Sequence, residues 1–228
     1  FRLDLTRPLV MGIVNNTPDS FSDGGHHHSV TAALRHAEKL LKDGAHILDI
    51  GGESTRPGSP AVPLEEEMRR VLPFVQAAVQ FGVPISVDTY KAQVMQAVLD
   101  AGADIINDVW ALRQPGAQSV VANHPQCGVV LMHMHKTPQD MQQTPMQGDA
   151  VAQVQNFLAQ QTQALVALGV ERQRIVWDYG IGFGKTVAQN FALLAQQAAL
   201  TRQGFALLAG WSRKSSLGQV TNLSVEER

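Results

Sequence analysis

Two aspartates, an asparagine and a lysine are the residues of this chain best placed for chemistry, because each follows a short apolar run. Asp88 follows Ile-Ser-Val and Asp178 follows Ile-Val-Trp, while Asn107 and Lys214 come after similar stretches. A carboxylate at the end of an apolar strand is partly desolvated and needs a partner. A single aspartate there most often caps the next helix or pairs with a neighbouring base, but the four groups together favour a ligand-binding site.

The glycine-rich stretch from Gly180 to Thr186 differs from known phosphate-binding loops. Position 179, where a P-loop would need glycine, is Tyr179, and Lys185 takes the third glycine position of the dinucleotide pattern. We therefore predict a strand-to-helix loop. Its glycines would let the backbone approach a flat ligand, and Phe183 could pack on that ligand.

Neither histidine group has a recognisable metal-site spacing. Three adjacent residues, His26-His27-His28, seldom converge on one ion, so we interpret them as a solvated lead-in to a helix. His133 and His135 share one face of a predicted strand but have no third ligand at a recognisable spacing. Cys127, the only cysteine, precedes an apolar run and is interpreted as a small buried hydrophobe.

Composition excludes several classes of protein. The 228 residues are 17% charged and 44% hydrophobic, with a net charge of -2 and the two signs interspersed, which disfavours a polyanion-binding protein. No apolar run reaches the ~18 residues of a membrane helix, and the first residues lack signal-peptide order, so we expect a cytoplasmic protein. Because the chain begins with Phe1, the numbering is expected to start inside a longer polypeptide.

The elements that must position these groups alternate between strand and helix. Segments with helical spacing separate the apolar runs, with predicted helix starts at Ser29 and Pro63. Glycines follow the predicted helices, where they supply a left-handed turn. We predict strands at 10–14, 47–50, 85–87, 105–106, 129–132, 175–177 and 206–209, and exit glycines at Gly44, Gly82, Gly102 and Gly169.

Nearly continuous apolar strands joined by helices indicate a parallel α/β sheet, either a barrel or an open doubly wound sheet. Hydrogen-bonding residues end all seven runs, which favours a (β/α)8 TIM barrel over an open sheet with one switch point. A barrel needs eight strands. We therefore predict one domain over 1–228 whose last strand and helices are absent from this chain.

Several long segments are similar to one known family. The chain resembles the dihydropteroate synthases, of the pterin-binding TIM-barrel family, from about residue 9 to its last residue. The first two segments are the most specific. The matching segments are Met11-Gly12-Ile13-Val14-Asn15-Asn16-Thr17-Pro18-Asp19-Ser20-Phe21-Ser22-Asp23-Gly24-Gly25, Asp49-Ile50-Gly51-Gly52-Glu53-Ser54-Thr55-Arg56-Pro57-Gly58, Ser86-Val87-Asp88-Thr89, Ile106-Asn107-Asp108, Leu131-Met132-His133-Met134, Gly182-Phe183-Gly184-Lys185 and Ser212-Arg213-Lys214-Ser215.

The resemblance implies a transferase of folate biosynthesis. Such an enzyme condenses 6-hydroxymethyl-7,8-dihydropterin pyrophosphate with 4-aminobenzoate, giving 7,8-dihydropteroate and pyrophosphate by an SN1-like mechanism. It also implies Mg2+ as cofactor, inhibition by sulfonamides, which mimic 4-aminobenzoate, and a homodimer. No nucleic acid or membrane partner is expected.

The resemblance also assigns residue roles. Asp88, Asp178 and Lys214 would be catalytic, the aspartates on the pyrimidine edge of the pterin and the lysine on its carbonyl and ring nitrogen. Asn15 would help bind Mg2+. The implied substrate-binding residues are Asn107 and Met132 at the pterin, Thr55 and Arg56 at the phosphate, Phe21, Arg56, Pro57, Phe183 and Ser212 at the aminobenzoate, and Arg213 beside Lys214.

Some features depart from the family pattern. Asn16, Tyr179 and Trp211 stand where the family usually has valine, proline and a smaller side chain. The chain also ends at Arg228, before the family's Arg-x-His pair. Two alternatives stay open: the pterin-binding domain of a corrinoid methyltransferase, which the Ser-Arg-Lys-Ser run and the Thr-Pro-Asp-Ser-Phe loop disfavour, and a non-catalytic pterin-binding remnant.

Overall fold

A computed structural model describes residues 1–15, 26–55, 58–138, 140–141 and 143–228, with the side chains of 26–29 outside the description. The chain divides into two compact units. The first comprises Phe1–Ser54, Pro60–Asp108 and Leu112–Val129, and the second comprises Thr55–Ser59, Val109–Ala111 and Val130–Arg228. None of the described helices is long and apolar enough to cross a membrane.

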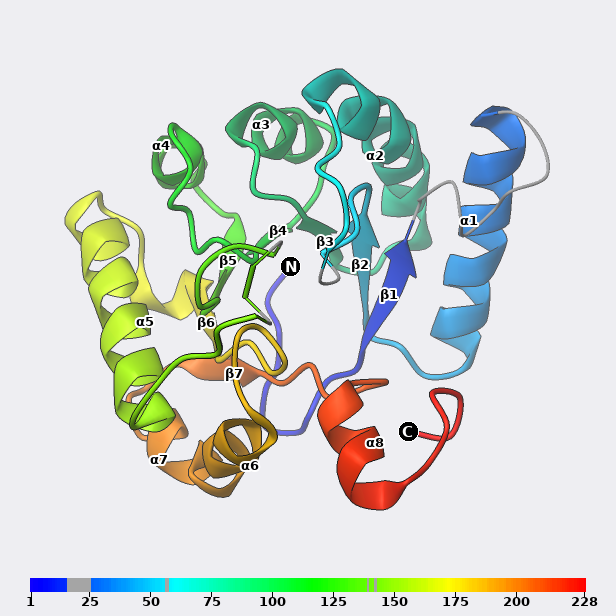
Figure 1. Ribbon diagram of the computed structural model, residues 1–228. Coiled ribbons are helices and arrows are strands. Elements are labelled where there is room, and N and C mark those ends of the chain that lie inside the picture. Colours follow the sequence, from blue (N-terminus) through cyan, green and yellow to red (C-terminus); the bar gives the residue numbers. More distant parts are fainter. Residues whose placement is uncertain (16–25, 56–57, 139, 142) are drawn as a thin grey trace. The chain divides into compact units, whose positions relative to one another are not determined.

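The first unit is a parallel sheet flanked by helices (Figure 1). Its strands pair in the order β1, β2, β3, β4, and each strand is followed in the chain by one helix. This alternation is the predicted one. The elements are β1 (Met11–Asn15), α1 (His26–Lys42), β2 (Ile47–Gly51), α2 (Leu64–Ala78) with the short 3-10 helix η2 (Val79–Phe81), β3 (Ile85–Asp88), α3 (Ala92–Asp100), β4 (Ile105–Asp108) and α4 (Ala117–Asn123).

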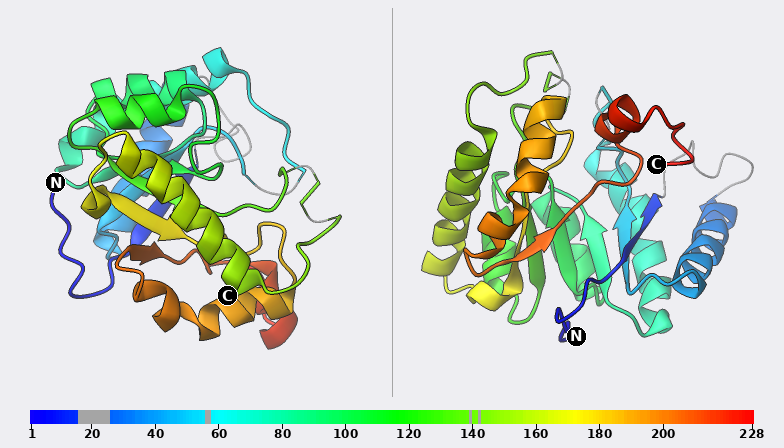
Figure 2. Two further views of the ribbon diagram at one scale, coloured as in Figure 1. Left: turned by 90° about the vertical axis from the view of Figure 1, so that its left-hand side faces the viewer. Right: turned by 90° about the horizontal axis from the view of Figure 1, so that it is seen from below.

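The second unit continues the same pattern. Its strand β6 pairs in parallel with β7, and helices α5 and α6 lie side by side (Figure 2). Strand β5 runs across the boundary of the two units in the chain. The elements are β5 (Gly128–Met132), α5 (Ala150–Ala167), the 3-10 helix η3 (Arg172–Arg174), β6 (Ile175–Asp178), α6 (Val187–Ala195), α7 (Gln197–Thr201), β7 (Ala206–Leu208) and α8 (Ser215–Thr221).

Strand register brings polar residues to one level within each unit. Asp88 at the end of β3 is paired with Gly51 of β2 and with Asn107 of β4. In the second unit, the His133 N–H donates to the Asp178 carbonyl oxygen (2.9 Å), so the chain leaving β5 meets the end of β6. Parallel strands in register therefore gather their terminal side chains at one edge.

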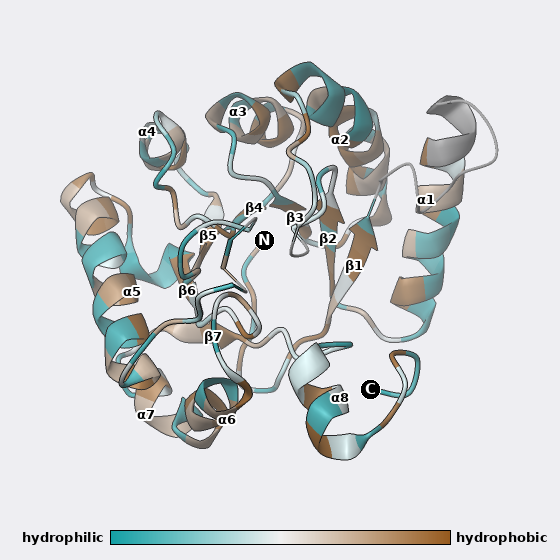
Figure 3. Cartoon of the chain, in the orientation of Figure 1, coloured by the Kyte–Doolittle hydropathy of each residue, from teal (hydrophilic) through white to brown (hydrophobic). Residues whose placement is uncertain are grey.

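Apolar side chains are buried between the sheet and the helices. Val14, Leu48 and Ile50 are fully buried, and in Figure 3 strands β1 and β2 are largely brown whereas α1 and α2 carry both colours. In the second unit Trp177 stacks on Phe205 with ring centroids 4.6 Å apart. This arrangement is that of amphipathic helices covering a hydrophobic sheet.

All seven predicted strands are present, with boundaries that differ by a residue or two. Asn15, Asp88 and Asp178 are the last residues of their strands rather than the first residues beyond them. The predicted exit glycines have the positive φ of a left-handed turn, and Pro63 is the N-cap of α2. The start at Ser29 was wrong, since α1 begins at His26.

Candidate active site

Several carboxylates of the first unit lie within its strands or at their ends. Asp49, inside β2, accepts hydrogen bonds from the Ser86 hydroxyl (2.6 Å) and from the Asn107 carboxamide nitrogen (3.2 Å). Asp108, fully buried at the end of β4, accepts one from the Leu112 N–H (2.7 Å). Asp49 therefore fixes the orientation of the Asn107 amide, one of the predicted ligand-binding groups.

Electrostatic repulsion in this cluster acts mainly on Asp88. Burial, followed by the charges of Asp49, Asp108, Glu67 and Glu53, raises the pKa of Asp88 well above its usual value. Burial also raises the pKa of Asp49, against the effect of its two hydrogen bonds. A site of this kind favours ligands that present N–H donors or positive charge, because either would stabilise the ionised carboxylates.

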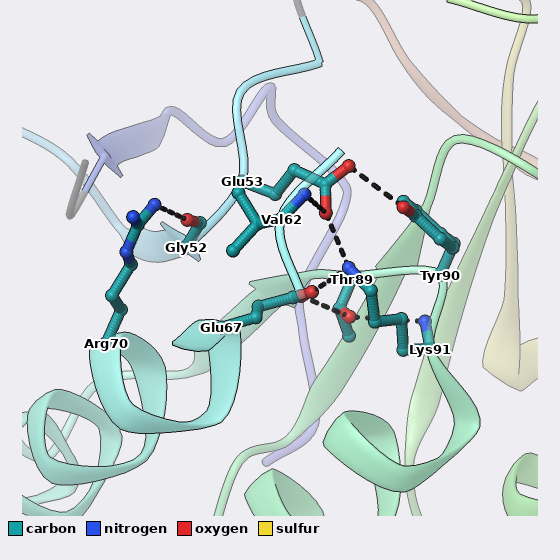
Figure 4. A network of polar contacts seen from close by, with 8 residues as sticks. All are labelled: Gly52, Glu53, Val62, Glu67, Arg70, Thr89, Tyr90 and Lys91. Carbon is teal, nitrogen blue, oxygen red and sulfur yellow. Dashed lines mark hydrogen bonds and ion pairs between the residues drawn. The ribbon is translucent and has the colours of Figure 1, made fainter. Parts of the chain in front are cut away.

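Glu53 and Glu67 of this unit belong to a second polar network (Figure 4). The Lys91 ammonium forms ion pairs with both Glu53 and Glu67. The Thr89 hydroxyl donates to Glu67 (2.6 Å), and the Tyr90 hydroxyl donates to Glu53 (2.9 Å). The turn after β3 is therefore bound both to helix α2 and to the loop that follows β2.

In the second unit, Asp178 shapes the glycine loop that follows β6. Its carboxylate accepts a hydrogen bond from the Gly180 N–H (2.7 Å). Gly180 has φ 62°, and a Cβ at this position would overlap the His133 carbonyl oxygen. Only glycine combines a left-handed backbone with such close approach. The Asp178 carboxylate thus stabilises the turn at Tyr179 and Gly180.

The buried Lys185 side chain stabilises this loop through hydrogen bonds to the backbone. Its ammonium, on a 4% exposed residue, donates to the carbonyl oxygens of Gly180 (2.8 Å), His133 (3.2 Å) and Phe183 (3.3 Å). Burial lowers the pKa of Lys185 to about 7, with Asp178 opposing that change and Lys214 adding to it. The loop conformation therefore depends on one buried lysine.

Phe183 and Lys214 form the aromatic and cationic part of the second unit. The Lys214 ammonium lies 4.4 Å from the centroid of the Phe183 ring, a cation–π contact. Phe183 packs with Met132 in a buried apolar cluster completed by Val109, Met134 and Met141, with Trp110 packed against it. A flat apolar surface next to a cation suits an aromatic ligand with a polar edge.

The predicted site residues fall into two sets. In the first unit, Asn15 and Asp88 flank Gly51, where an added Cβ would lie 3.3 Å from the Asn15 amide oxygen and 3.8 Å from the Asp88 Cβ. Asp88 is also in register with Asn107. The second unit contains Thr55, Met132, Asp178, Phe183, Ser212, Arg213 and Lys214.

Some predicted residues are peripheral or undescribed. Ser212 and Arg213 are exposed, and the Arg213 N–H donates to the Arg228 carbonyl oxygen (3.1 Å). Phe21, Arg56, Pro57 and the unusual Asn16 lie outside the described residues.

Two unusual aromatic residues take structural positions. The hydroxyl of the buried Tyr179 donates to the Gln197 side-chain oxygen (3.0 Å) and so links the end of β6 to α7. Trp211 packs at a tilt on Phe191, with ring centroids 5.3 Å apart.

Of the two histidine groups, only the second has described side chains. The imidazole of His133 meets the edge of the Phe157 ring at 5.1 Å, a packing contact. Among the described residues, no group of three or more His, Cys, Asp or Glu side chains is arranged to hold a metal ion.

Sequence reasoning missed four polar residues that organise the site. Asp49 could have been found, because a carboxylate interrupts the apolar run of β2. Asp108 follows Asn107 directly and was treated only as part of its run. Lys91 and Lys185 carry no signal that separates them from exposed lysines, because their partners come from distant parts of the chain.

Comparisons with known proteins show which family the chain is similar to. A family described as pterin binding enzyme matches residues 11–228. Dihydropteroate synthase of Escherichia coli (strain K12) is 45% identical over 99% of this chain and 80% of its own length. A Yersinia pestis dihydropteroate synthase with a sulfonamide drug superposes with a TM-score of 0.92 at 45% identity, covering 99% of this chain and 82% of that one. A Xanthomonas albilineans dihydropteroate synthase with 4-aminobenzoic acid gives 0.91 at 51% identity, covering 99% and 80%.

Proposed function

The chain belongs to the pterin-binding enzyme family and, within it, to the dihydropteroate synthases. We propose how its residues perform the reaction of these enzymes. The reaction joins 6-hydroxymethyl-7,8-dihydropterin pyrophosphate to 4-aminobenzoate and releases pyrophosphate. The fold is the α/β TIM-barrel fold of this family. The observation that carries the assignment of roles is the cluster of buried carboxylates around Asp88.

Pterin recognition is assigned to the strand-end groups. In the first unit, Asp88 and Asn107 face the pyrimidine edge, whose N–H groups supply the donors that ionised carboxylates lack. For the second unit, the family resemblance assigns Asp178 to pterin N–H groups and Lys214 to the pterin carbonyl and ring nitrogen. Met132 and Phe183 supply apolar surface. These contacts let the ring be buried without leaving polar groups unsatisfied.

Carbon–oxygen cleavage precedes attack in the proposed mechanism. The bond between the pterin methylene and pyrophosphate breaks, and its electron pair leaves with the pyrophosphate. The amino nitrogen of 4-aminobenzoate then attacks the cationic methylene and loses a proton. Asp88 and Asp178, as carboxylates on the pterin edge, stabilise the positive charge that develops on the ring.

The leaving pyrophosphate is assigned to Thr55, Arg56 and Asn15. Thr55 and Arg56 would bind its oxygens. The Asn15 carboxamide oxygen is a hard donor on an exposed strand-end residue, which fits Mg2+, an ion that keeps several waters and binds substrate phosphates. When bound, Mg2+ would neutralise charge on the departing pyrophosphate.

Phe183 and Ser212 are proposed to contact 4-aminobenzoate. A homodimer is proposed as the assembly.

Turnover by the purified protein tests this function. We expect 7,8-dihydropteroate and pyrophosphate in equal amounts from the two substrates with Mg2+, measured by liquid chromatography with mass detection. Asp88→Asn should abolish most of the product. Preferential binding of methyltetrahydrofolate would instead favour a methyltransferase domain. Binding of pterin pyrophosphate without turnover would indicate a pterin-binding protein lacking the activity.

A further inference from the structure

The loop between β2 and α2 has both of its ends fixed by one carboxylate. Glu53 lies two residues after β2, and its Oε2 accepts a hydrogen bond from the Val62 N–H (3.1 Å), just before Pro63 caps α2. The chain between these residues therefore starts and returns at one point. Thr55, assigned to the substrate phosphate, is two residues past Glu53.

Glu53 is held in turn by the segment after β3. The Tyr90 hydroxyl donates to its Oε1 (2.9 Å), and the Lys91 ammonium binds its Oε2 (Figure 4). The Glu53 and Lys91 side chains are only 11% and 15% exposed. A carboxylate with three partners and little water cannot rotate away without leaving buried polar groups unpaired.

Lys91 connects this carboxylate to helix α2. The same ammonium binds Glu67, whose side chain is 1% exposed and also accepts a hydrogen bond from the Thr89 hydroxyl (2.6 Å). Its two carboxylate partners raise the pKa of Lys91 to about 12, although burial opposes them. The ammonium therefore stays charged at any pH at which the protein would work.

Close packing fixes the backbone just before Glu53. The Arg70 guanidinium donates to the Gly52 carbonyl oxygen (2.9 Å), and a Cβ at Gly52 would lie 2.5 Å from Val71 Cγ2. Farther along the loop, the Gly58 N–H donates to the Pro138 carbonyl oxygen (3.2 Å). The base of the loop is thus tied to α2 and to the turn after β3.

We propose that Glu53, held by Lys91, is a positioning residue that fixes the chain at Gly52 and at Val62 and so orients Thr55 for binding the substrate phosphate. This inference rests on the proposed function for the identity of that ligand. Neither side chain is assigned a contact with substrate. Their effect is exerted through the direction in which the chain leaves Gly52 and returns at Val62.

Glu53→Gln is the decisive variant because it preserves volume and removes one charge of the ion pair. We expect the Val62 amide to exchange its hydrogen at least tenfold faster. The KM for 6-hydroxymethyl-7,8-dihydropterin pyrophosphate should rise about tenfold, while the Kd for 6-hydroxymethyl-7,8-dihydropterin, which lacks the pyrophosphate, should change less than twofold. Lys91→Arg, which keeps the charge, should restore most of the wild-type behaviour relative to Lys91→Met.

The matched control is Lys39→Met, because Lys39 of α1 makes an exposed ion pair with Asp43, the residue after this helix. It should leave all three measurements unchanged. Unchanged Val62 exchange in Glu53→Gln would overturn the inference, and so would equal losses of affinity for the pterin with and without its pyrophosphate. If the wild-type protein makes no dihydropteroate, the proposed function fails, whereas Val62 exchange in Glu53→Gln still shows whether Glu53 holds Val62 in place.

Discussion

Lys91 in the first unit and Lys185 in the second are both buried lysines, yet their environments act in opposite directions. Two carboxylates bind Lys91 and raise its pKa to about 12. Lys185 donates to three backbone carbonyl oxygens, and burial lowers its pKa to about 7. Burial disfavours both ammonium ions, so the partner decides the outcome: full negative charges outweigh desolvation, whereas carbonyl dipoles do not.

This difference makes the stability of the two regions depend differently on charge removal and on pH. The first unit is held by a cation that keeps its proton, and its carboxylates repel one another enough to raise the pKa of Asp88. The second unit is held by a lysine that can lose its proton near neutral pH. We therefore expect charge removal to matter most in the first region and pH to matter most in the second.

Lys91→Met should have the largest effect on stability. It leaves the buried Glu67 and the largely buried Glu53 without a counter-charge, so the free energy of unfolding should fall by about 3–5 kcal/mol. Denaturant titration measures this, with Lys39→Met as the exposed control. A loss below about 1 kcal/mol, the range of exposed ion pairs, would contradict the assigned role of Lys91.

Asp88→Asn and Asp178→Asn compare one carboxylate from each region. Each removes a charged acceptor for a pterin N–H, so kcat/KM should fall about 100-fold, corresponding to about 3 kcal/mol. Steady-state kinetics at one pH measures both. If only one variant lost activity, the equivalence of the two carboxylates would be wrong.

The pH dependence of stability should reveal Lys185. Its folded pKa of about 7 lies below the usual 10.5, so unfolding takes up a proton between these values and stability rises with pH. The gain from pH 7 to 9 should be about 2 kcal/mol in the wild type. Lys185→Met should lack that rise, as measured by urea unfolding at each pH. Parallel curves for the two proteins would show that Lys185 keeps its proton.

Asp49→Asn should produce the smallest change, a shift of the acid limb in the pH profile of kcat/KM. Asp88 must be ionised to accept pterin donors, so activity falls as pH drops through its raised pKa. Asp49 contributes the largest repulsion from a neighbouring charge. Its removal should move the limb to lower pH by about one unit. Asp43→Asn, an exposed change just after α1, should leave the limb in place.

The order of elements and the strand-end residues could be predicted from sequence because both depend on local patterns. Apolar runs between amphipathic segments predicted every strand, and the exit glycines predicted the left-handed turns. Helix starts were less predictable, as Ser29 shows, because α1 begins at His26 and Ser29 lies inside its first turn. Asp88 and Asn107 were identified because strand ends in a parallel sheet share one edge.

The sequence by itself determined the family, the alternation of strand and helix, and the types of residue at the strand ends. Only the tertiary structure decided which of the lysines are buried and what partners they meet. Lys91 and Glu53 are 38 residues apart, and Lys185 and His133 are 52 apart. No pattern along the chain encodes such pairs, because the pKa and the anchoring role of a side chain come from the charges and dipoles that folding places around it.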